Sequence, residues 1–314
     1  MLGGLLYLGS GIGLTLIRIV RDRGFKASGL LQGEWSWLLG AILFGGVLGP
    51  VALMFGLTQT SGSTASLLLN LEAVLTAVLA WVVFKENADR RVVLGMVAIV
   101  AGGIVLSWPS GVTNETSWFG PIAIAAACLC WAIDNNLTRK VSTSDALFIA
   151  SSKGLIAGGI NCALAITLGA TFPNGVTFLS TMAVGLLGYG ASLVLIVLAL
   201  RGLGTARTGA YFSTAPFIGA ALALTLLGES TSSAFWLACV LMAVGVWLHL
   251  TERHEHTHTH EPLEHLHRHV HDEHHQHEHS PLWDGKEPHE HLHLHATVTH
   301  KHLHYPDIHH RHSH

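Results

Sequence analysis

The sequence predicts an all-α integral membrane protein with nine spanning helices, built as an inverted repeat of two five-helix units from which the first helix is missing. Half of the 314 residues are hydrophobic and only 12% are charged, a balance that fits a bilayer protein. The apolar residues gather in runs near the roughly 20 residues that a helix needs to cross the hydrocarbon. The chain also repeats itself, because Gly45 falls on Gly188 and Glu86 on Glu229, in both cases 143 residues further along.

Helices are expected for every span, since they satisfy their own backbone hydrogen bonds inside lipid. Gly and Ala are dense within the apolar runs, which suits close packing between membrane helices. Several Trp residues stand near the ends of the runs, where an interfacial aromatic belt is expected. The runs lie at residues 2–20, 35–59, 62–84, 92–108, 119–138, 146–170, 179–200, 206–227 and 233–250.

The basic residues predict the orientation of the chain. Arg21, Lys85, Arg139 and Arg201 follow the first, third, fifth and seventh spans, whereas the intervening connections contain no Lys or Arg. By the positive-inside rule, the connections that carry these residues are cytoplasmic. The sequence therefore predicts a multi-pass protein of the cell (inner) membrane, with residues 251–314 forming a cytoplasmic tail.

The repeat divides the membrane part into two units. Residues 1–110 contain four predicted helices and residues 111–250 contain five. The run at 119–138 has no counterpart after Met1, so we expect that the chain begins one helix late; a natural nine-helix protein is the alternative. A unit with an odd number of crossings turns its second copy upside down, as in many secondary transporters.

Two stretches carry a resemblance to a known family. The segment GLTQTSGSTASLLLNLEAVLTAVLAWVVFKE at 56–86 and the segment LRGLGTARTGAYFSTAPFIGAALALTLLGE at 200–229 each precede a further helix that contains Gly. This pattern resembles the EamA-type repeat of the drug/metabolite transporter (DMT) superfamily. The resemblance implies ten helices, cytoplasmic termini and transport, often export, of small organic molecules such as amino acids, metabolites or drugs. The missing first helix and the charge at Glu72 depart from the family pattern.

Glu72 is the first candidate for a role in transport. It lies about ten residues from either end of its span, near the midplane, where ionisable groups are costly and transporter sites form. Thr76 shares its stripe of the helix, and Asn70 belongs to a second polar or small stripe on the other side. We expect this helix inside the bundle. Glu72 then either exchanges protons with the solute or serves as a permanently protonated hydrogen-bonding group.

Asp134 and Lys153 are the other two charges within the predicted hydrocarbon. Both lie in the cytoplasmic part of adjacent spans, so we expect them to meet as an ion pair. Such a pair serves either the structure or the transport path. The neighbouring Asn135 and Asn136 extend this polar patch, either as a cap of the helix end or as the lining of a cytoplasmic mouth.

Repeat-related interruptions predict where a solute binds. GGVLGP at 45–50 and GLLGYG at 185–190 fall in corresponding spans, and Gly or Pro breaks at matching places are a pointer to a transporter site. Ordinary packing of Gly between membrane helices is the alternative. We expect Tyr211, Ser213 and Thr214 to supply neutral hydrogen-bonding groups opposite Glu72.

The tail is rich in histidine. All 24 His residues occur from His249 onward, interleaved with Asp and Glu. This composition predicts a segment that is disordered without metal and that binds zinc, nickel, cobalt or copper through imidazole. The metal-ligand candidates are His254, His256, His258, His260, His265, His267, His269, His271, His274, His275, His277 and His279.

Three functions fit these observations. The first is a secondary transporter, and more specifically an exporter, of a small organic solute with proton coupling as an option and a metal-binding tail. The second is a divalent-metal exporter of zinc, nickel or cobalt, although the spans offer no histidine-lined path before His249. The third is a membrane-anchored metal-binding protein without transport. The expected partners are the lipid bilayer, the solute and divalent metal ions, with no nucleic acid. No nucleophile or nucleotide loop predicts an enzyme, and the sequence leaves the oligomeric state open.

Overall fold

The computed structural model describes residues 1–83, 90–108 and 118–251 together with four short strands between residues 255 and 303. Within these residues nine helical spans are long and apolar enough to cross a membrane, which confirms the all-α membrane fold. The spans are Leu2–Asp22, Glu34–Leu57, Gly62–Val82, Arg90–Ser107, Phe119–Val141, Ala146–Thr167, Gly175–Thr205, Arg207–Leu227 and Ser233–Leu250.

Four of these spans are not uniform α-helices. Two contain π-helical segments, η1 and η2, which begin at the repeat-related residues Ile42 and Gly185. Two others are interrupted, at residues 69–70 and 213–214. The helical elements are α1 (Leu2–Asp22), α2 (Glu34–Ala41), η1 (Ile42–Leu48), α3 (Gly49–Leu57), α4 (Gly62–Leu68), α5 (Leu71–Val82), α6 (Arg90–Ser107), α7 (Phe119–Val141), α8 (Ala146–Thr167), α9 (Gly175–Val184), η2 (Gly185–Gly190), α10 (Ala191–Phe212), α11 (Ala215–Leu227) and α12 (Ser233–Leu250).

One further bend separates the seventh span from the eighth. It lies inside α10 at Gly204, whose φ of 76° and ψ of 176° are not helical. A residue with a Cβ is strained at this φ, whereas Gly adopts it readily. The glycine therefore allows the chain to leave one span and start the next within a single element.

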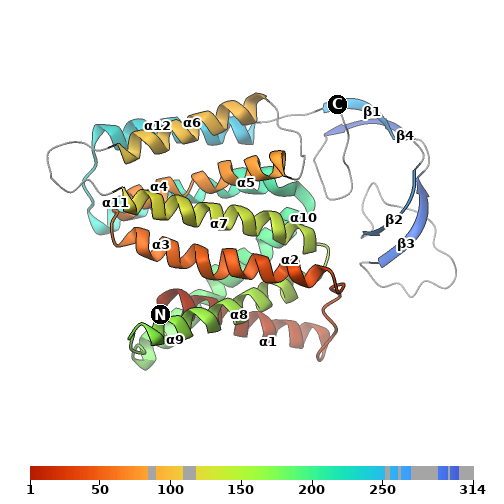
Figure 1. Cartoon of the computed structure of the whole chain (residues 1–314), viewed down its shortest axis with the longest axis horizontal. Helices are drawn as coiled ribbons and strands as arrows, with labels where there is room; N and C mark the ends of the chain where they lie inside the picture. The colour runs from red at the N-terminus through yellow and green to blue at the C-terminus, as the bar shows by residue number, and fades with distance from the viewer. Residues whose placement is uncertain are drawn as a thin grey trace.

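Repeat-related helices pack against each other in pairs. The helices α6 and α12 lie side by side in Figure 1, and extensive contacts also join α1 to α8. The contact between α4 and α11 joins two spans that are related by the repeat. The α1–α8 contact is close because small residues meet there: a Cβ on Gly154 would come within 2.5 Å of the Gly11 amide. Small residues of this kind let membrane helices approach backbone to backbone.

The helix α7 lies in the interior of the bundle, between α5 and α3 (Figure 1). It covers spans of the first unit, and 44% of the Glu34–Leu57 window and 50% of the Gly62–Val82 window are buried. The corresponding windows in the second unit, in Gly175–Thr205 and Arg207–Leu227, are each 22% buried. Within the described residues, no helix covers this second pair as α7 covers the first.

Within the described residues, the tail contains four short strands. The strands β1 (Glu255–His260) and β4 (Val298–Leu303) pair antiparallel, as do β2 (Leu263–His269) and β3 (His289–His295). Histidine alternates with Thr, Leu, Glu, Arg or Lys along these segments, and a period of two matches the alternation of a strand.

Candidate functional site

A buried ion pair joins α7 to α8. The Lys153 Nζ donates to both Asp134 carboxylate oxygens, at 2.6 and 2.8 Å, and to Thr138 Oγ1 at 3.1 Å. Thr138 donates in turn to Asp134 Oδ1 at 2.7 Å. Asp134 is 6% exposed and Lys153 is 4% exposed, so either charge alone would be costly. The predicted ion pair is present, and it links two neighbouring spans.

The π-helix η1 packs directly against this ion pair. Gly45 is required there, because a Cβ at this position would overlap the Asp134 carboxylate. The Gly45 carbonyl accepts hydrogen bonds from Tyr7 Oη and Trp131 Nε1, both at 3.0 Å, and Asn161 Nδ2 donates to the following carbonyl at 2.6 Å. Polar side chains from α1, α7 and α8 therefore hold η1 in place.

Tyr7 connects the two π-helical segments. Its hydroxyl binds η1, while its ring lies 4.8 Å, centroid to centroid, from the ring of Tyr189 in η2. The sequence predicted interruptions at both segments, and the structure shows a change of helix type rather than a break. Segments of π-helix often occur at functional sites.

The actual break in the first unit lies between α4 and α5, and it determines the setting of Glu72. Because α5 begins at Leu71, Glu72 stands in its first turn. A helix N-terminus carries partial positive charge, which favours a carboxylate at that place. Glu72 Oε1 also accepts a hydrogen bond from Asn135 Nδ2 at 2.9 Å, and the same amide lies 3.4 Å from Thr76 Oγ1. All the predicted polar residues on this stripe thus meet one side chain of α7.

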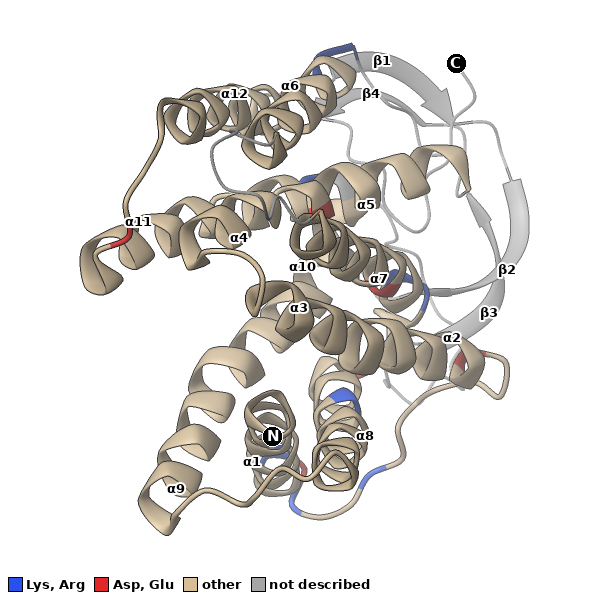
Figure 2. Ribbon diagram, turned by 60° about the vertical axis from the view of Figure 1, so that its left-hand side comes forward, with Lys and Arg blue, Asp and Glu red and all other residues tan. Residues whose placement is uncertain are grey.

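Consecutive residues of α7 bring the two polar groups together. Asp134 faces α8, whereas Asn135 faces α5. Asn136 is buried, and its Nδ2 donates to the Thr76 carbonyl at 3.2 Å and to its own helix at 2.9 Å. Glu72 and Asn135 are half-buried, in contrast to the enclosed ion pair. Charged residues are otherwise sparse along the helices (Figure 2).

The other predicted neutral residues make local hydrogen bonds. Asn70 is buried at the α4–α5 break and donates to the Leu67 carbonyl at 3.1 Å. Ser213 Oγ donates to Gly209 O at 2.9 Å, and Thr214 Oγ1 donates to Tyr211 O at 2.9 Å. The Tyr211 side chain is exposed. These bonds do not place Tyr211, Ser213 or Thr214 opposite Glu72, and that arrangement stays a prediction.

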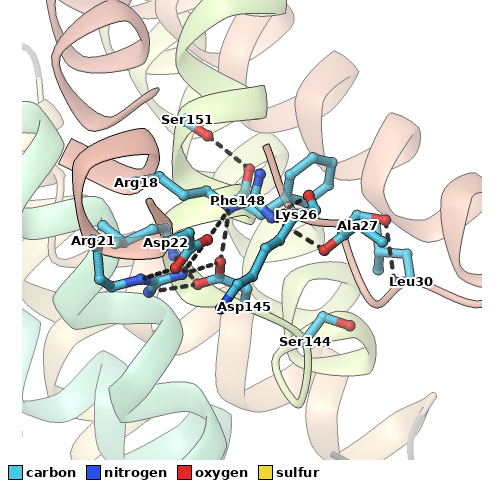
Figure 3. A network of polar contacts seen from close by, with 12 residues as sticks. Arg18, Arg21, Asp22, Lys26, Ala27, Leu30, Ser144, Asp145, Phe148 and Ser151 are labelled. Carbon is cyan, nitrogen blue, oxygen red and sulfur yellow. Dashed lines mark hydrogen bonds and ion pairs between the residues drawn. The ribbon is translucent and has the colours of Figure 1, made fainter. Parts of the chain in front are cut away.

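A second polar network lies at the end of α1 and the start of α8 (Figure 3). Arg18 Nε and Arg21 Nη2 donate to the Asp145 carboxylate at 2.9 and 2.6 Å, and the Arg18 guanidinium lies 5.0 Å from the centre of the Phe148 ring. Partial burial raises the pKa of Asp145, but hydrogen bonds from Arg21 and Arg18 outweigh it, so the pKa lies below the usual value. The network joins two repeat-related helices at the end predicted to be cytoplasmic.

The predicted metal ligands fall into two groups. Residues His256, His258, His260, His265, His267 and His269 lie in β1 and β2. Residues His254, His271, His274, His275, His277 and His279 lie outside the described residues. Among the residues whose side chains are described, no three His, Cys, Asp or Glu residues form a metal-binding group.

Sequence reasoning missed three residues that hold η1. Tyr7 and Trp131 were read as part of apolar runs, and Asn161 was not singled out. Asn161 offered a signal, because an amide in the middle of an apolar span needs a hydrogen-bonding partner. Tyr7 and Trp131 offered none, since aromatic residues are common in membrane helices.

Comparisons with known proteins agree with this architecture. The profile of the EamA-like transporter family matches residues 1–108 and 118–251. An uncharacterized transporter of Methanothermobacter thermautotrophicus is 26% identical over 79% of this chain and 76% of its own length. The uncharacterized transporter YyaM of Bacillus subtilis is 25% identical over 65% of this chain and 70% of its own.

Similarity to a solved crystal structure supports the fold alone. That structure superposes with a TM-score of 0.62 at 19% identity and covers 80% of this chain and 88% of its own. The two matched ranges of the family profile together include every described helix of the bundle. This chain therefore belongs to the EamA-like transporter family.

Proposed function

We propose that the chain is a secondary transporter that exports a small organic solute and couples its movement to protons through Glu72. The observation that carries this proposal is the position of Glu72 at the α4–α5 break, half-buried and hydrogen-bonded to Asn135. Discontinuous helices near the midplane are where transporters of several folds bind solutes and coupling ions. Glu72 is less enclosed than Asp134, which is 6% exposed.

The two carboxylates of the bundle take different roles in this proposal. Asp134 is occupied by Lys153 and Thr138 and is almost fully enclosed. Its charge is neutralised within the protein, so it positions α7 against α8 and η1. Glu72 accepts its side-chain hydrogen bond from a neutral group, the amide of Asn135. A carboxylate in such a setting can gain and lose a proton without breaking an ion pair.

The same proposal includes location and orientation. We place the protein in the cell (inner) membrane with the α1–α8 network and the C-terminal tail on the cytoplasmic side. The support is the row of basic residues after alternate spans, Arg21, Arg139 and Arg201 among them, of which Arg21 binds Asp145. Export then moves the solute from the side of this network to the side of the 228–232 connection.

Solute flux in membrane vesicles tests the proposal. Inverted and right-side-out vesicles with the parent protein, with Glu72→Gln or without the protein would be assayed against amino acids, metabolites and cationic drugs. The parent should move at least one solute above the empty vesicles, and Glu72→Gln should lose the dependence of that flux on pH. Glu34→Gln makes the same chemical change at the first residue of α2, at the end of a span and far from the midplane, and is expected to behave as the parent. Equal rates and equal pH dependence in Glu72→Gln and the parent would eliminate coupling through Glu72.

A further inference from the structure

The strands of the tail bring histidines from its two halves opposite one another. In the inner ribbon, β2 and β3 pair His265 with His293, His267 with His291 and His269 with His289. In the outer ribbon, β1 and β4 pair His256 with His302 and His258 with His300. Each of these five pairs is a direct cross-strand pair in the backbone register.

Both ribbons follow a single register. Within each ribbon, every step forward along β1 or β2 moves the partner one step back along β4 or β3. The histidines therefore recur at every second position on both strands of a ribbon at once. A shift of either strand by one residue would place Thr, Leu or charged residues opposite His, so the pairing of His with His depends on this register.

The backbone alone fixes the spacing of these histidine positions. Directly opposite residues of an antiparallel pair share a face, with Cβ atoms about 4.5–5.5 Å apart. Positions i and i+2 share the same face and stand about 6.8 Å apart along the strand, twice the rise of 3.4 Å. Two neighbouring pairs make a block of four imidazole positions on one face. A zinc ion requires four ligands in a tetrahedron at about 2.0–2.1 Å from nitrogen, and a block of this size supplies them.

We infer that each ribbon is a zinc site made by cross-strand histidine pairs. The outer site uses His256, His258, His300 and His302, and the inner site is built around His267 and His291 with a neighbouring pair. Imidazole also suits nickel, cobalt and copper, so the ligand set favours borderline transition metals as a class. The inference concerns the tail alone and does not depend on the proposed transport.

The register adds ligands that sequence reasoning did not include. Candidates were placed only between His254 and His279, on the reasoning that acidic residues alternate with histidine there. The pairing shows that residues of the first half need partners from His289 to His302. The positions that alternate with the histidines carry other residues: Arg268 is paired with Glu290, and Leu266 is paired with Leu292. Charge and apolar character thus fall on positions that alternate with the histidines.

Metal binding would also stabilise a two-stranded ribbon, which has no hydrophobic core of its own. An isolated pair of strands is at best marginally stable in water, because it has no core to bury. Where a metal site does not exist in the unfolded chain, the free energy of binding becomes free energy of folding. The strands and the disorder expected from composition are then two states of the same segment, with metal favouring the ribbon.

The first test measures metal affinity in the full-length protein in detergent, stripped with chelator and titrated with zinc or with cobalt as a spectroscopic probe. The parent should bind at least two ions, and cobalt should give the intense visible bands of tetrahedral coordination. His267→Ala and His291→Ala should each weaken the inner site by about tenfold to a hundredfold. Because both residues serve one ion, the double variant should lose less than the product of the single losses.

Matched controls distinguish binding by specific cross-strand histidines from binding that depends only on the number of histidines. The double variant His309→Ala/His310→Ala removes the same number of histidines from outside the four strands and should retain the parent affinity. The pair His267→Ala/His300→Ala removes one ligand from each ribbon, so its two losses should multiply. Equal losses for all three pairs would show that binding follows the number of histidines alone and would overturn the inference, as would the absence of zinc binding.

A second test reads the register without metal affinity. Single cysteines would replace His267 and His291 in one variant and His267 and His300 in another, with the four native cysteines unchanged. Cross-strand partners are close enough for a disulfide, so mild oxidation in the presence of zinc should link 267 to 291. Peptide mass spectrometry would detect the link. Equal or faster linking of 267 to 300 would contradict the register and with it the assignment of ligands.

Discussion

Removal of Lys153 tests whether the Asp134–Lys153 pair holds α7 against α8. Lys153→Met preserves the length and the apolar stem of the side chain but deletes three hydrogen bonds, of 2.6, 2.8 and 3.1 Å. Asp134, 6% exposed, is then left without its counter-charge. Breaking one partner of a buried ion pair costs about 3–5 kcal/mol.

The assay is unfolding of the purified protein in mixed micelles, followed by far-ultraviolet circular dichroism as the denaturing detergent increases. Lys153→Met should lower the free energy of unfolding by about 3–5 kcal/mol, whereas Lys26→Met, at an exposed position, should change it little. The double variant Lys153→Met/Asp134→Leu removes both charges, so it should recover most of the loss. A loss in Lys153→Met below about 1 kcal/mol, or a double variant less stable than the single one, would refute the reasoning.

Three further outcomes follow from the described contacts. Gly45→Ala should destabilise the protein by about 1–3 kcal/mol, because the added Cβ would overlap Asp134. The repeat-related Gly188→Ala, whose Cβ would meet open space, should be close to neutral. Equal effects of the two variants in the same unfolding assay would contradict the packing of η1. Glu229 accepts hydrogen bonds at 2.8 Å from two amides at the start of α4. The hydrogen bond from the Ser63 hydroxyl, together with these amide bonds, holds the pKa of Glu229 below the usual value. The contribution of Glu229 to stability should therefore be complete above about pH 4.5 and should disappear as the pH falls through the lower pKa of the folded state. Glu229→Gln should not show this loss when unfolding is measured from about pH 6 to about pH 3. Deletion of residues 252–314 should leave solute flux in vesicles intact, and a loss of flux would tie the tail to transport.

The spans and the ion pair could be predicted because they depend on short-range rules. An apolar run of membrane length specifies a helix, and two opposite charges at similar depth in adjacent spans have no better partner than each other. Lys153 and Asp134 meet for this reason. Glu72 and Thr76 were correctly placed on one stripe, since a helical spacing of four puts them on the same face.

The details of the site could not be predicted because they depend on which helices are neighbours. Asn135 was expected to cap a helix end or to line a mouth, whereas it binds Glu72 of a helix 63 positions earlier in the chain. The break at 69–70 had no Gly or Pro to announce it, and the glycine-rich segments that were expected to break became π-helices. Tyr7 and Asn161 act on η1 from two other spans, a contact that only the packing determines.

The pairing of the tail strands could not be predicted from the sequence either. Histidine content predicted metal binding, and the period of two was visible in the sequence. The partner of each strand was not visible, because a repetitive segment offers many similar registers. The pairing of His267 with His291 rather than with any nearer histidine is therefore information that only the structure provides.

The measurement that tests the central claim most directly is proton movement driven by a solute in proteoliposomes. The purified parent, Glu72→Gln and Glu34→Gln would each be reconstituted with a trapped pH indicator, and a gradient of the solute identified in vesicles would be imposed. The account predicts a pH change inside the liposomes with the parent and Glu34→Gln, and none with Glu72→Gln even where solute still moves. A pH change of equal size with Glu72→Gln would contradict it.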